Sequence, residues 1–291
     1  MRAMEVIRTA ASMRAHADRC RANGLTTALV PTMGGVHAGH LALAKKARRL
    51  ADHVTVSIFV NPTQFAPDED LERYPRDLDA DVDKLGTFGG VDLVFAPFAL
   101  YGEGAAAQKV WVDSGELTTH LCGPHRLGHF RGVATVVTKL FALCRPDVAV
   151  FGLKDAQQFF LVKKLSDDLL FGVRIVGVDT VRERDGLALS SRNVYLSFEE
   201  RAQAVVLSRS VEAARRAILK GERSPGRVVA AMRRELERSA LARVQYAEVV
   251  STDTLAPIEA IVPGRQVLAA VAVFFSATRL IDNAIVRAPR P

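Results

Sequence analysis

The chain has 291 residues, of which 49% are hydrophobic and 24% charged, a balance that excludes a disordered or fibrous protein. The net charge of +7 is spread over short basic clusters without a basic stripe interleaved with aromatic residues, so we expect no nucleic-acid partner. Three cysteines at unrelated spacings, no recognisable secretory signal and no apolar run long enough for a bilayer predict a cytoplasmic protein that does not associate with membranes.

Short apolar runs alternate with amphipathic segments over the larger, amino-terminal part of the chain. The apolar runs predict buried parallel strands at residues 26–30, 54–60, 91–95, 148–151 and 173–178. The amphipathic segments predict helices at residues 40–52, 77–85, 133–143 and 155–170. This βα alternation predicts an α/β fold with a doubly wound parallel sheet, whose ligands bind beyond the carboxyl ends of the strands.

The pattern changes after Val178. A loop over residues 182–193 precedes charged helices across residues 197–239 and short strands near residues 246–250 and 266–275. We therefore expect two domains, a Rossmann-like domain at residues 1–182 and a smaller C-terminal α+β domain at residues 183–291. Two low-complexity patches, residues 105–107 and 288–291, are predicted to be a loop and a frayed terminus.

The first motif that indicates chemistry is PTMGGVHAGH, residues 31–40, which follows a strand and opens a helix. Gly34 and Gly35 let the backbone approach a phosphate closely, and the helix start adds N–H donors. His37 and His40 lie on one face of the first turn, where imidazoles can stabilise phosphate charge and one can protonate a leaving pyrophosphate. The alternatives are a glycine-rich turn with incidental histidines, or a zinc pair, for which no third ligand is close in sequence.

Two further motifs are weaker. In GLKDAQQ, residues 152–158, Lys154 can neutralise phosphate charge and Gln158, one turn further, can bind a hydroxyl or a carboxylate. In DGLALSSRN, residues 185–193, two hydroxyls precede Arg192 in a loop that could close over a triphosphate. Either motif also has a purely structural explanation, as a helix start or a capped turn.

A group of possible metal ligands lies between the first two motifs. It consists of His120, Cys122, His125 and His129. The spacing matches no closed tetrahedral pattern, and the intervening glycines and proline indicate a loop, so we expect no zinc there.

Together with VNPTQF (60–65) and GHFRGVATVVTKLF (128–141), these motifs closely resemble the pantothenate synthetase (pantoate:β-alanine ligase) family. The resemblance runs nearly without gaps from Pro31 to Ser197, with five motifs in order, while the last 90 or so residues match only in general character. It implies a homodimer with a Rossmann-like nucleotidyltransferase fold. It also implies a reaction in which pantoate and ATP give pantoyl adenylate and pyrophosphate, after which β-alanine releases pantothenate and AMP.

The resemblance also implies site residues. The ATP-binding residues would be Met33, Gly34, Gly35, Val36, His37, Ala38, Gly39, His40, Gly152, Leu153, Lys154, Asp155, Val181, Leu189, Ser190, Ser191 and Arg192. His40 would be the proton donor, and His37 and Lys154 would stabilise phosphate charge. Gln64 and Gln158 would bind pantoate, with Gln64 also beside β-alanine, and Asp81 would bind the Mg²⁺ that accompanies ATP. The first domain would bind ATP and pantoate, and the second would act as a lid.

Five positions depart from the usual family pattern. Gly35, Val36 and Ala38 replace the commoner Ala, Leu and Glu, Leu153 stands where Glu is usual, and Ala156 replaces an aromatic residue. None of these changes removes a proposed donor, but the changes at 153 and 156 bear on nucleotide affinity.

Two rival functions share part of the pattern. A nucleotidyltransferase that leaves AMP on a phosphate-bearing substrate would share the first motif but would not explain Gln64 and Gln158. A non-catalytic nucleotide-binding module would need affinity alone, and it would not explain two histidines together with Lys154 and Arg192.

Overall fold

The structure is a computed structural model that describes residues 4–66, 69–102 and 107–290. It divides into two compact units. Unit 1 comprises Met1–Ser114, Arg126–Leu153 and Leu161–Asp179, and unit 2 comprises Gly115–His125, Lys154–Phe160 and Thr180–Pro291. Unit 2 thus includes two short segments from earlier in the chain, and the functional division at residues 182 and 183 stays a prediction.

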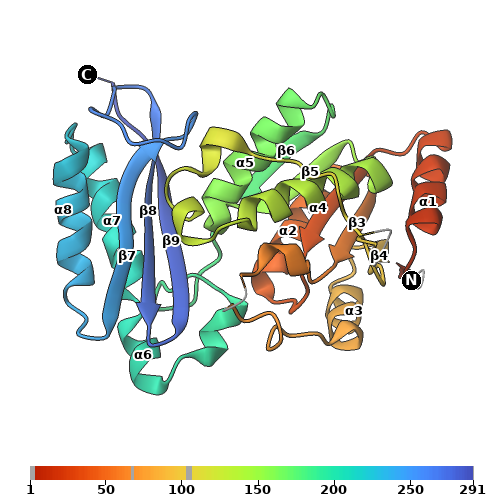
Figure 1. The fold of residues 1–291 in the computed structure, drawn as a ribbon, viewed down its shortest axis with the longest axis horizontal. Coiled ribbons are helices and arrows are strands. Elements are labelled where there is room, and N and C mark those ends of the chain that lie inside the picture. The colour runs from red at the N-terminus through yellow and green to blue at the C-terminus, as the bar shows by residue number, and fades with distance from the viewer. Residues whose placement is uncertain (1–3, 67–68, 103–106, 291) are drawn as a thin grey trace. The chain divides into compact units, whose positions relative to one another are not determined.

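A six-stranded parallel sheet forms the centre of unit 1 (Figure 1). Its strands are β1 (Glu5–Ile7), β2 (Thr27–Thr32), β3 (His53–Ile58), β4 (Leu93–Phe95), β5 (Val148–Gly152) and β6 (Arg174–Val178). Its helices are α1 (Ala10–Ala22), α2 (Ala38–Arg48), α3 (Leu78–Phe88) and α4 (His129–Cys144), with α5 (Ala156–Asp168) beginning in a unit 2 segment and ending in unit 1. A short 3₁₀ helix, η1 (Pro62–Gln64), follows β3.

The strand order is β1-β4-β3-β2-β5-β6. From β2 the chain continues to β3 and β4 on one side, and β5 and β6 lie on the other, so the order reverses between β2 and β5. Ligands of open α/β sheets bind at such a reversal, beyond the carboxyl ends of the strands. The first two motifs therefore begin at the two strand ends that flank this point.

The predicted doubly wound sheet is confirmed, and each predicted strand of unit 1 is present. The central strands are buried because their residues are continuously apolar, as Leu29, Val30 and Val150 show, each 0% exposed. The sequence analysis missed β1 and α1. A strand of three residues is too short to show a period, and β1 pairs in parallel with β4 at the edge of the sheet.

Unit 2 contains a three-stranded antiparallel sheet in the order β7-β8-β9, with helices packed on it (Figure 1). Its strands are β7 (Ala242–Ser251), β8 (Gln266–Phe275) and β9 (Thr278–Arg287), and its helices are α6 (Phe198–Gln203), α7 (Val206–Leu219) and α8 (Pro225–Leu236). The 3₁₀ helices are η3 (Gly115–Thr118), η4 (Gly123–His125), η5 (Leu153–Asp155), whose first residue belongs to unit 1, and η6 (Ser191–Tyr195). Apolar side chains of α7, α8 and the sheet form one core, in which Ile218, Met232 and Val271 are 0% exposed. The predicted α+β character is confirmed, and β9 was not predicted.

The carboxyl-terminal segment is held in place. The backbone N–H of Ala288, a residue 1% exposed, donates to the Arg265 carbonyl (2.9 Å), and the Pro289 carbonyl accepts from Arg223 Nη2 (3.0 Å). The prediction of a frayed terminus is wrong for residues 288–290, because burial and hydrogen bonding outweigh the proline-rich composition. The predicted loop at residues 105 and 106 lies outside the described residues.

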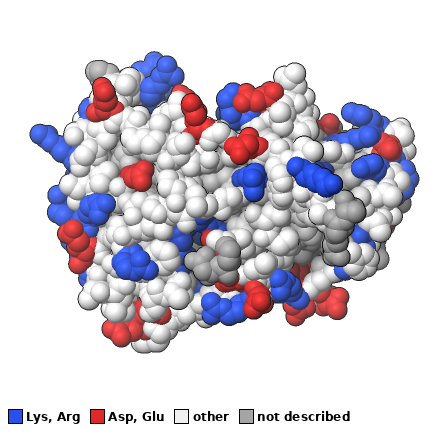
Figure 2. Space-filling view, viewed as in Figure 1, with Lys and Arg blue, Asp and Glu red and all other residues white. Residues whose placement is uncertain are grey.

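On the face shown in Figure 2, basic side chains are scattered among acidic ones instead of gathering in one patch. Among the helices of the described residues, none combines the length and apolar character needed to cross a membrane.

Candidate active site

The glycine loop after β2 is held by a buried carboxylate. Gly34 and Gly35 have φ angles of 88° and 63°, in the left-handed region that favours glycine. Asp81 of α3, 3% exposed, accepts hydrogen bonds from the N–H groups of Gly35 (2.9 Å) and Val36 (2.7 Å). A Cβ at Gly34 would lie 2.9 Å from Asp81 Oδ2, so this position has no room for a side chain.

The two histidines of the motif cap α2. His37 is the N-cap residue, and its Nδ1 accepts from the Gly39 N–H (3.0 Å), while His40 Nδ1 accepts from the His37 N–H (3.4 Å). The rings stack with centroids 4.2 Å apart. Because each Nδ1 accepts, the neutral form of each ring carries its proton on Nε2, as a phosphate-binding imidazole requires.

Gly39 is needed for this arrangement. The His37 ring folds back over it, and a Cβ at this position would lie 2.7 Å from His37 Cε1. A side chain there would displace the ring that caps the helix.

A pocket of about 260 Å³ lies beyond the carboxyl ends of β2, β3 and β4, within unit 1. Met33, Gly34 and Asp81 line one part of it, and Arg8 and Arg76 contribute guanidinium groups. The position agrees with the rule for open α/β sheets, and the lining pairs these two arginines with two aspartates, Asp77 and Asp81.

Gln64 belongs to a network that the sequence analysis did not anticipate. Its side chain is 8% exposed, and its Oε1 accepts from Asn61 Nδ2 (2.8 Å). Its backbone carbonyl accepts from Arg126 Nη2 (3.3 Å) and from His129 Nδ1 (2.8 Å). Arg126 also donates to both carboxylate oxygens of Glu69, at 2.6 and 2.7 Å. The segment that carries Gln64 is thus fixed by charge-assisted hydrogen bonds.

Helix α4 approaches this segment closely because it carries Gly132. A Cβ there would lie 2.4 Å from the Thr63 carbonyl oxygen, and the Gly132 carbonyl accepts from Asn61 Nδ2 (3.2 Å). Gly132 of the GHFRGVATVVTKLF motif is therefore required, because any side chain there would clash with the Thr63 carbonyl.

The motif after β5 is held by residues distant in sequence. The Lys154 carbonyl accepts from Asn283 Nδ2 of β9 (2.8 Å), a contact within unit 2. Gln157, 6% exposed, accepts from the Cys122 N–H (2.9 Å) and donates to the carbonyls of Leu117 (3.1 Å) and His120 (2.9 Å). Gln157 therefore anchors the loop 117–122, whereas its neighbour Gln158 is partly exposed on α5.

The third motif forms a capped turn. Ser190 is the N-cap of η6, and its Oγ accepts from the Arg192 N–H (3.3 Å). The Leu189 N–H donates to the Val181 carbonyl (2.9 Å), so two of the expected ATP-binding positions are adjacent in space.

The histidines and the cysteine between residues 120 and 129 contact different partners. Cys122 Sγ lies 3.2 Å from the Tyr246 hydroxyl and 3.3 Å from Arg279 Nη2, and the His125 ring stacks on Tyr246. His129 lies in the Gln64 network of unit 1.

The expected site residues fall into both units. Unit 1 holds residues 33–40, Gln64, Asp81, Gly152 and Leu153, and unit 2 holds Lys154, Asp155, Gln158, Val181 and residues 189–192. Within unit 1 the glycine loop, the histidine pair and Asp81 form one hydrogen-bonded group. The sequence analysis did not predict Asn61, Glu69 or Arg126 as part of the site. Of these three, Asn61 alone had a local sequence signal, because it lies in an N-P-T sequence typical of a side-chain-capped turn.

Comparison with known proteins identifies the family. The family model described as pantoate-beta-alanine ligase matches residues 5–285. The pantothenate synthetase of Salinibacter ruber is 56% identical over 98% of this chain and 99% of its own length. The structure of pantothenate synthetase from Thermus thermophilus has a TM-score of 0.89 at 45% identity, covering 98% of this chain and 100% of that one. That of the Francisella tularensis ligase, complexed with beta-gamma ATP and β-alanine, has a TM-score of 0.77 at 29% identity, covering 97% and 98%. The chain therefore belongs to the pantoate-beta-alanine ligase family.

Proposed function

We propose that this protein catalyses the ATP-dependent condensation of (R)-pantoate with β-alanine to pantothenate, through a pantoyl adenylate, with release of AMP and pyrophosphate. The observation that carries the proposal is the histidine-capped start of α2 beside a glycine loop, in a chain that matches the ligase family over nearly its whole length.

In the first step a pantoate carboxylate oxygen attacks the α-phosphorus of ATP, and the bond to the bridging oxygen of pyrophosphate breaks. Negative charge develops on the phosphate oxygens, where Nε2–H groups of His37 and His40 would donate hydrogen bonds. We assign His40 as the proton donor to the pyrophosphate, with His37 and Lys154 as charge-stabilising groups.

In the second step the β-alanine amine attacks the acyl carbon of the adenylate, an amide bond forms, and AMP leaves. Gln64 and Gln158 are the proposed pantoate ligands, and Gln64 also lies beside the proposed β-alanine position. The network of Glu69, Arg126 and His129 supports this assignment, because it holds the Gln64 backbone in one place.

The proposed ATP-binding residues are Met33 to His40, Gly152 to Asp155, Val181 and Leu189 to Arg192. Hydrogen bonding between Leu189 and Val181 supports treating the last two segments as one surface.

Asp81 is the proposed protein ligand of the Mg²⁺ that accompanies ATP. Its donor chemistry fits, since Mg²⁺ takes oxygen ligands, and each carboxylate oxygen has a second lone pair besides the one that accepts a backbone N–H. Asp81 also lines the pocket next to Gly34. The bound ion would offset charge on the phosphates. We further infer a homodimer from the family resemblance and a cytoplasmic location, supported by three unpaired cysteines.

Isotope exchange tests the proposed reaction. Pantoate without β-alanine should support exchange of labelled pyrophosphate into ATP, because adenylation precedes amine attack. Mass spectrometry of products with ATP, Mg²⁺, pantoate and β-alanine, each omitted in turn, should show pantothenate and AMP only in the complete mixture. Exchange that requires β-alanine would overturn the two-step reaction.

A further inference from the structure

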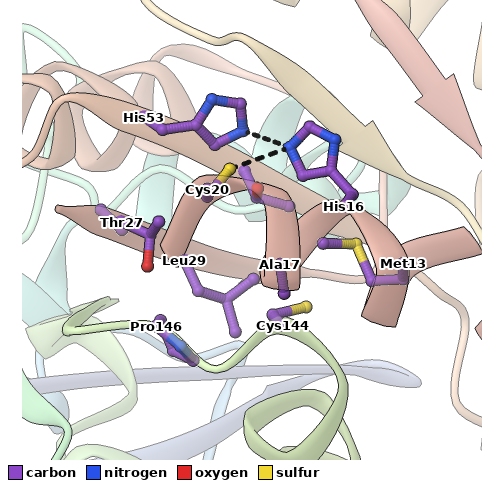
Figure 3. A pocket seen from close by; sticks show the side chains of 11 residues that line it. Met13, His16, Ala17, Cys20, Thr27, Leu29, His53, Cys144 and Pro146 are labelled. Carbon is purple, nitrogen blue, oxygen red and sulfur yellow. Dashed lines mark hydrogen bonds between the residues drawn. The ribbon is translucent and has the colours of Figure 1, made fainter. Parts of the chain in front are cut away.

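A second cluster of reactive side chains lies in unit 1 at the amino end of β3. His16 and Cys20 are four residues apart on α1 and point to the same side of the helix, and His53 is the first residue of β3 (Figure 3). His16 Nε2 lies 3.0 Å from His53 Nε2 and 3.4 Å from Cys20 Sγ. The cluster is therefore at the opposite end of the strand from the glycine-loop pocket.

The three atoms have the separations expected of metal ligands. All lie within 4.8 Å of one another. In a tetrahedral zinc site, bond lengths of about 2.0–2.1 Å to nitrogen and about 2.3 Å to sulfur put neighbouring ligands roughly 3.3–3.6 Å apart. A His₂Cys set with these distances needs only small side-chain movements to enclose an ion, and it leaves one position for water.

Carboxylates lie behind both histidines. Glu5 Oε2 is 3.7 Å from His16 Nδ1, and Asp92 Oδ2 is 3.8 Å from His53 Nδ1. In metal sites such a carboxylate orients the imidazole so that Nε2 carries the lone pair. If both rings adopt this tautomer, two lone pairs face each other across 3.0 Å, and a cation between them removes the repulsion.

An arrangement without metal is also available to the same residues. Arg19 Nη2 lies 3.3 Å from His16 Nδ1, so the arginine can donate there while His16 Nε2–H donates to His53. Glu5 and Arg19 thus support opposite tautomers of His16, one suited to a metal and the other to a hydrogen bond between the rings.

The adjacent space fits a single small species. The pocket lined by His16, Cys20 and His53 has a volume of about 10 Å³, roughly one water-sized sphere, which excludes an organic ligand. Cys144 lines the same pocket, but it is not part of the group whose ligand atoms lie within 4.8 Å of one another.

We propose that His16, Cys20 and His53 form a binding site for one divalent zinc-like ion. The ion would join α1 to the amino end of β3, outside the proposed active site, and so stabilise unit 1 without taking part in the reaction. Binding requires that Cys20 release its proton to solvent as the thiolate–metal bond forms.

Titration of the chelator-treated, full-length protein with Co²⁺ in the absence of nucleotide tests the proposal. One equivalent should produce a thiolate-to-cobalt charge-transfer band, because Cys20 Sγ is a ligand. Cys20→Ala should lose the band, and the matched variant Cys144→Ala should keep it, since Cys144 lines the pocket without being a ligand. A band that is absent from the wild type, or that survives in Cys20→Ala, would overturn the proposal.

Zinc affinity and thermal unfolding give a second, independent readout. Glu5→Gln should weaken Zn²⁺ binding about 10-fold or more, the usual effect of removing a carboxylate behind a ligating histidine. Zn²⁺ should raise the Tm of the wild type and not that of His53→Gln. Equal Zn²⁺-induced shifts in the two proteins would contradict the assignment even if Cys20→Ala did not fold.

Discussion

The ends of β2 and β5 flank the same point of the sheet, but their motifs are held in different ways. After β2, His37 and His40 hydrogen-bond to backbone N–H groups inside the motif itself. After β5, Lys154 is held through its carbonyl by Asn283, 129 residues away, and Gln157 contacts a loop 35 to 40 residues earlier. The histidine cap is encoded locally, although the glycines before it are held by Asp81 of α3, whereas the second motif is held by distant residues of unit 2.

The two motifs should therefore respond differently to mutation. Substitutions in the histidine cap should affect chemistry with little effect on folding. Substitutions around the second motif should affect stability and catalysis together.

The largest effect is expected for His40→Ala. Loss of a positioned acid should lower kcat by about 10²- to 10⁴-fold, with a smaller change in ATP affinity. Steady-state kinetics and calorimetric titration with ATP measure the two quantities, and His120→Ala, which removes an imidazole outside the motif, is the control. A loss confined to KM would show that His40 only binds substrate.

Gly39→Ala tests whether catalysis depends on the position in which the helix cap holds the His37 ring. The added Cβ would lie 2.7 Å from the ring, and a misplaced group of this kind can cost about 100-fold in kcat. Alanine favours helix over glycine by up to about 1 kcal/mol, which offsets the loss of the cap, so Tm should change little. Gly226→Ala in α8, whose Cβ would meet only Ser224 Oγ at 3.9 Å, provides the same helix preference as a control. Full activity in Gly39→Ala would show that the ring position does not matter.

Gln158→Glu and Gln157→Glu separate ligand binding from folding at the second motif. A negative charge at 158 should weaken pantoate binding about tenfold or more, while ATP affinity measured without pantoate changes little. A carboxylate at 157 cannot donate to the carbonyls of Leu117 and His120, which should cost about 1–3 kcal/mol of stability. Calorimetry with each ligand and thermal unfolding distinguish the two variants. Equal weakening of both ligands by Gln158→Glu would show that the acid binds elsewhere.

The smallest effect is expected for Asn283→Ala. Loss of one hydrogen bond to the Lys154 carbonyl should cost about 1 kcal/mol, or roughly fivefold in kcat/KM if the lysine moves with its backbone. An unchanged kcat/KM with a lower Tm would show that this contact supports only the fold.

Much of the fold could be predicted because its signals are local. The strand at residues 148–152 is a continuous apolar run, and the helix after it has a regular period. The glycines Gly34 and Gly35 have positive φ angles, which favour glycine at both positions, while their predicted close approach to a phosphate stays a prediction.

The rest depends on contacts between distant residues. Gln157 and Gln158 are identical in type and adjacent, and only the packed loop shows which one is a structural anchor. The hydrogen bonds by which Asp81 holds the glycine loop come from a helix 45 residues further along the chain, and neither the sequence nor the family resemblance gave a sign of them. His16 and His53 are 37 residues apart and form no spacing motif.

The cap of α2 has one further chemical consequence. A neutral His40 ring that gave up its Nε2 proton would become an imidazolate, so an acid step requires the ring to be doubly protonated first. A doubly protonated ring carries hydrogen on Nδ1 and cannot accept the His37 N–H, so protonation of His40 for the acid step would break this bond of the cap. Transfer of the Nε2 proton to pyrophosphate would leave the other hydrogen on Nδ1, so the cap would re-form only once exchange with solvent has removed the Nδ1 proton and returned one to Nε2.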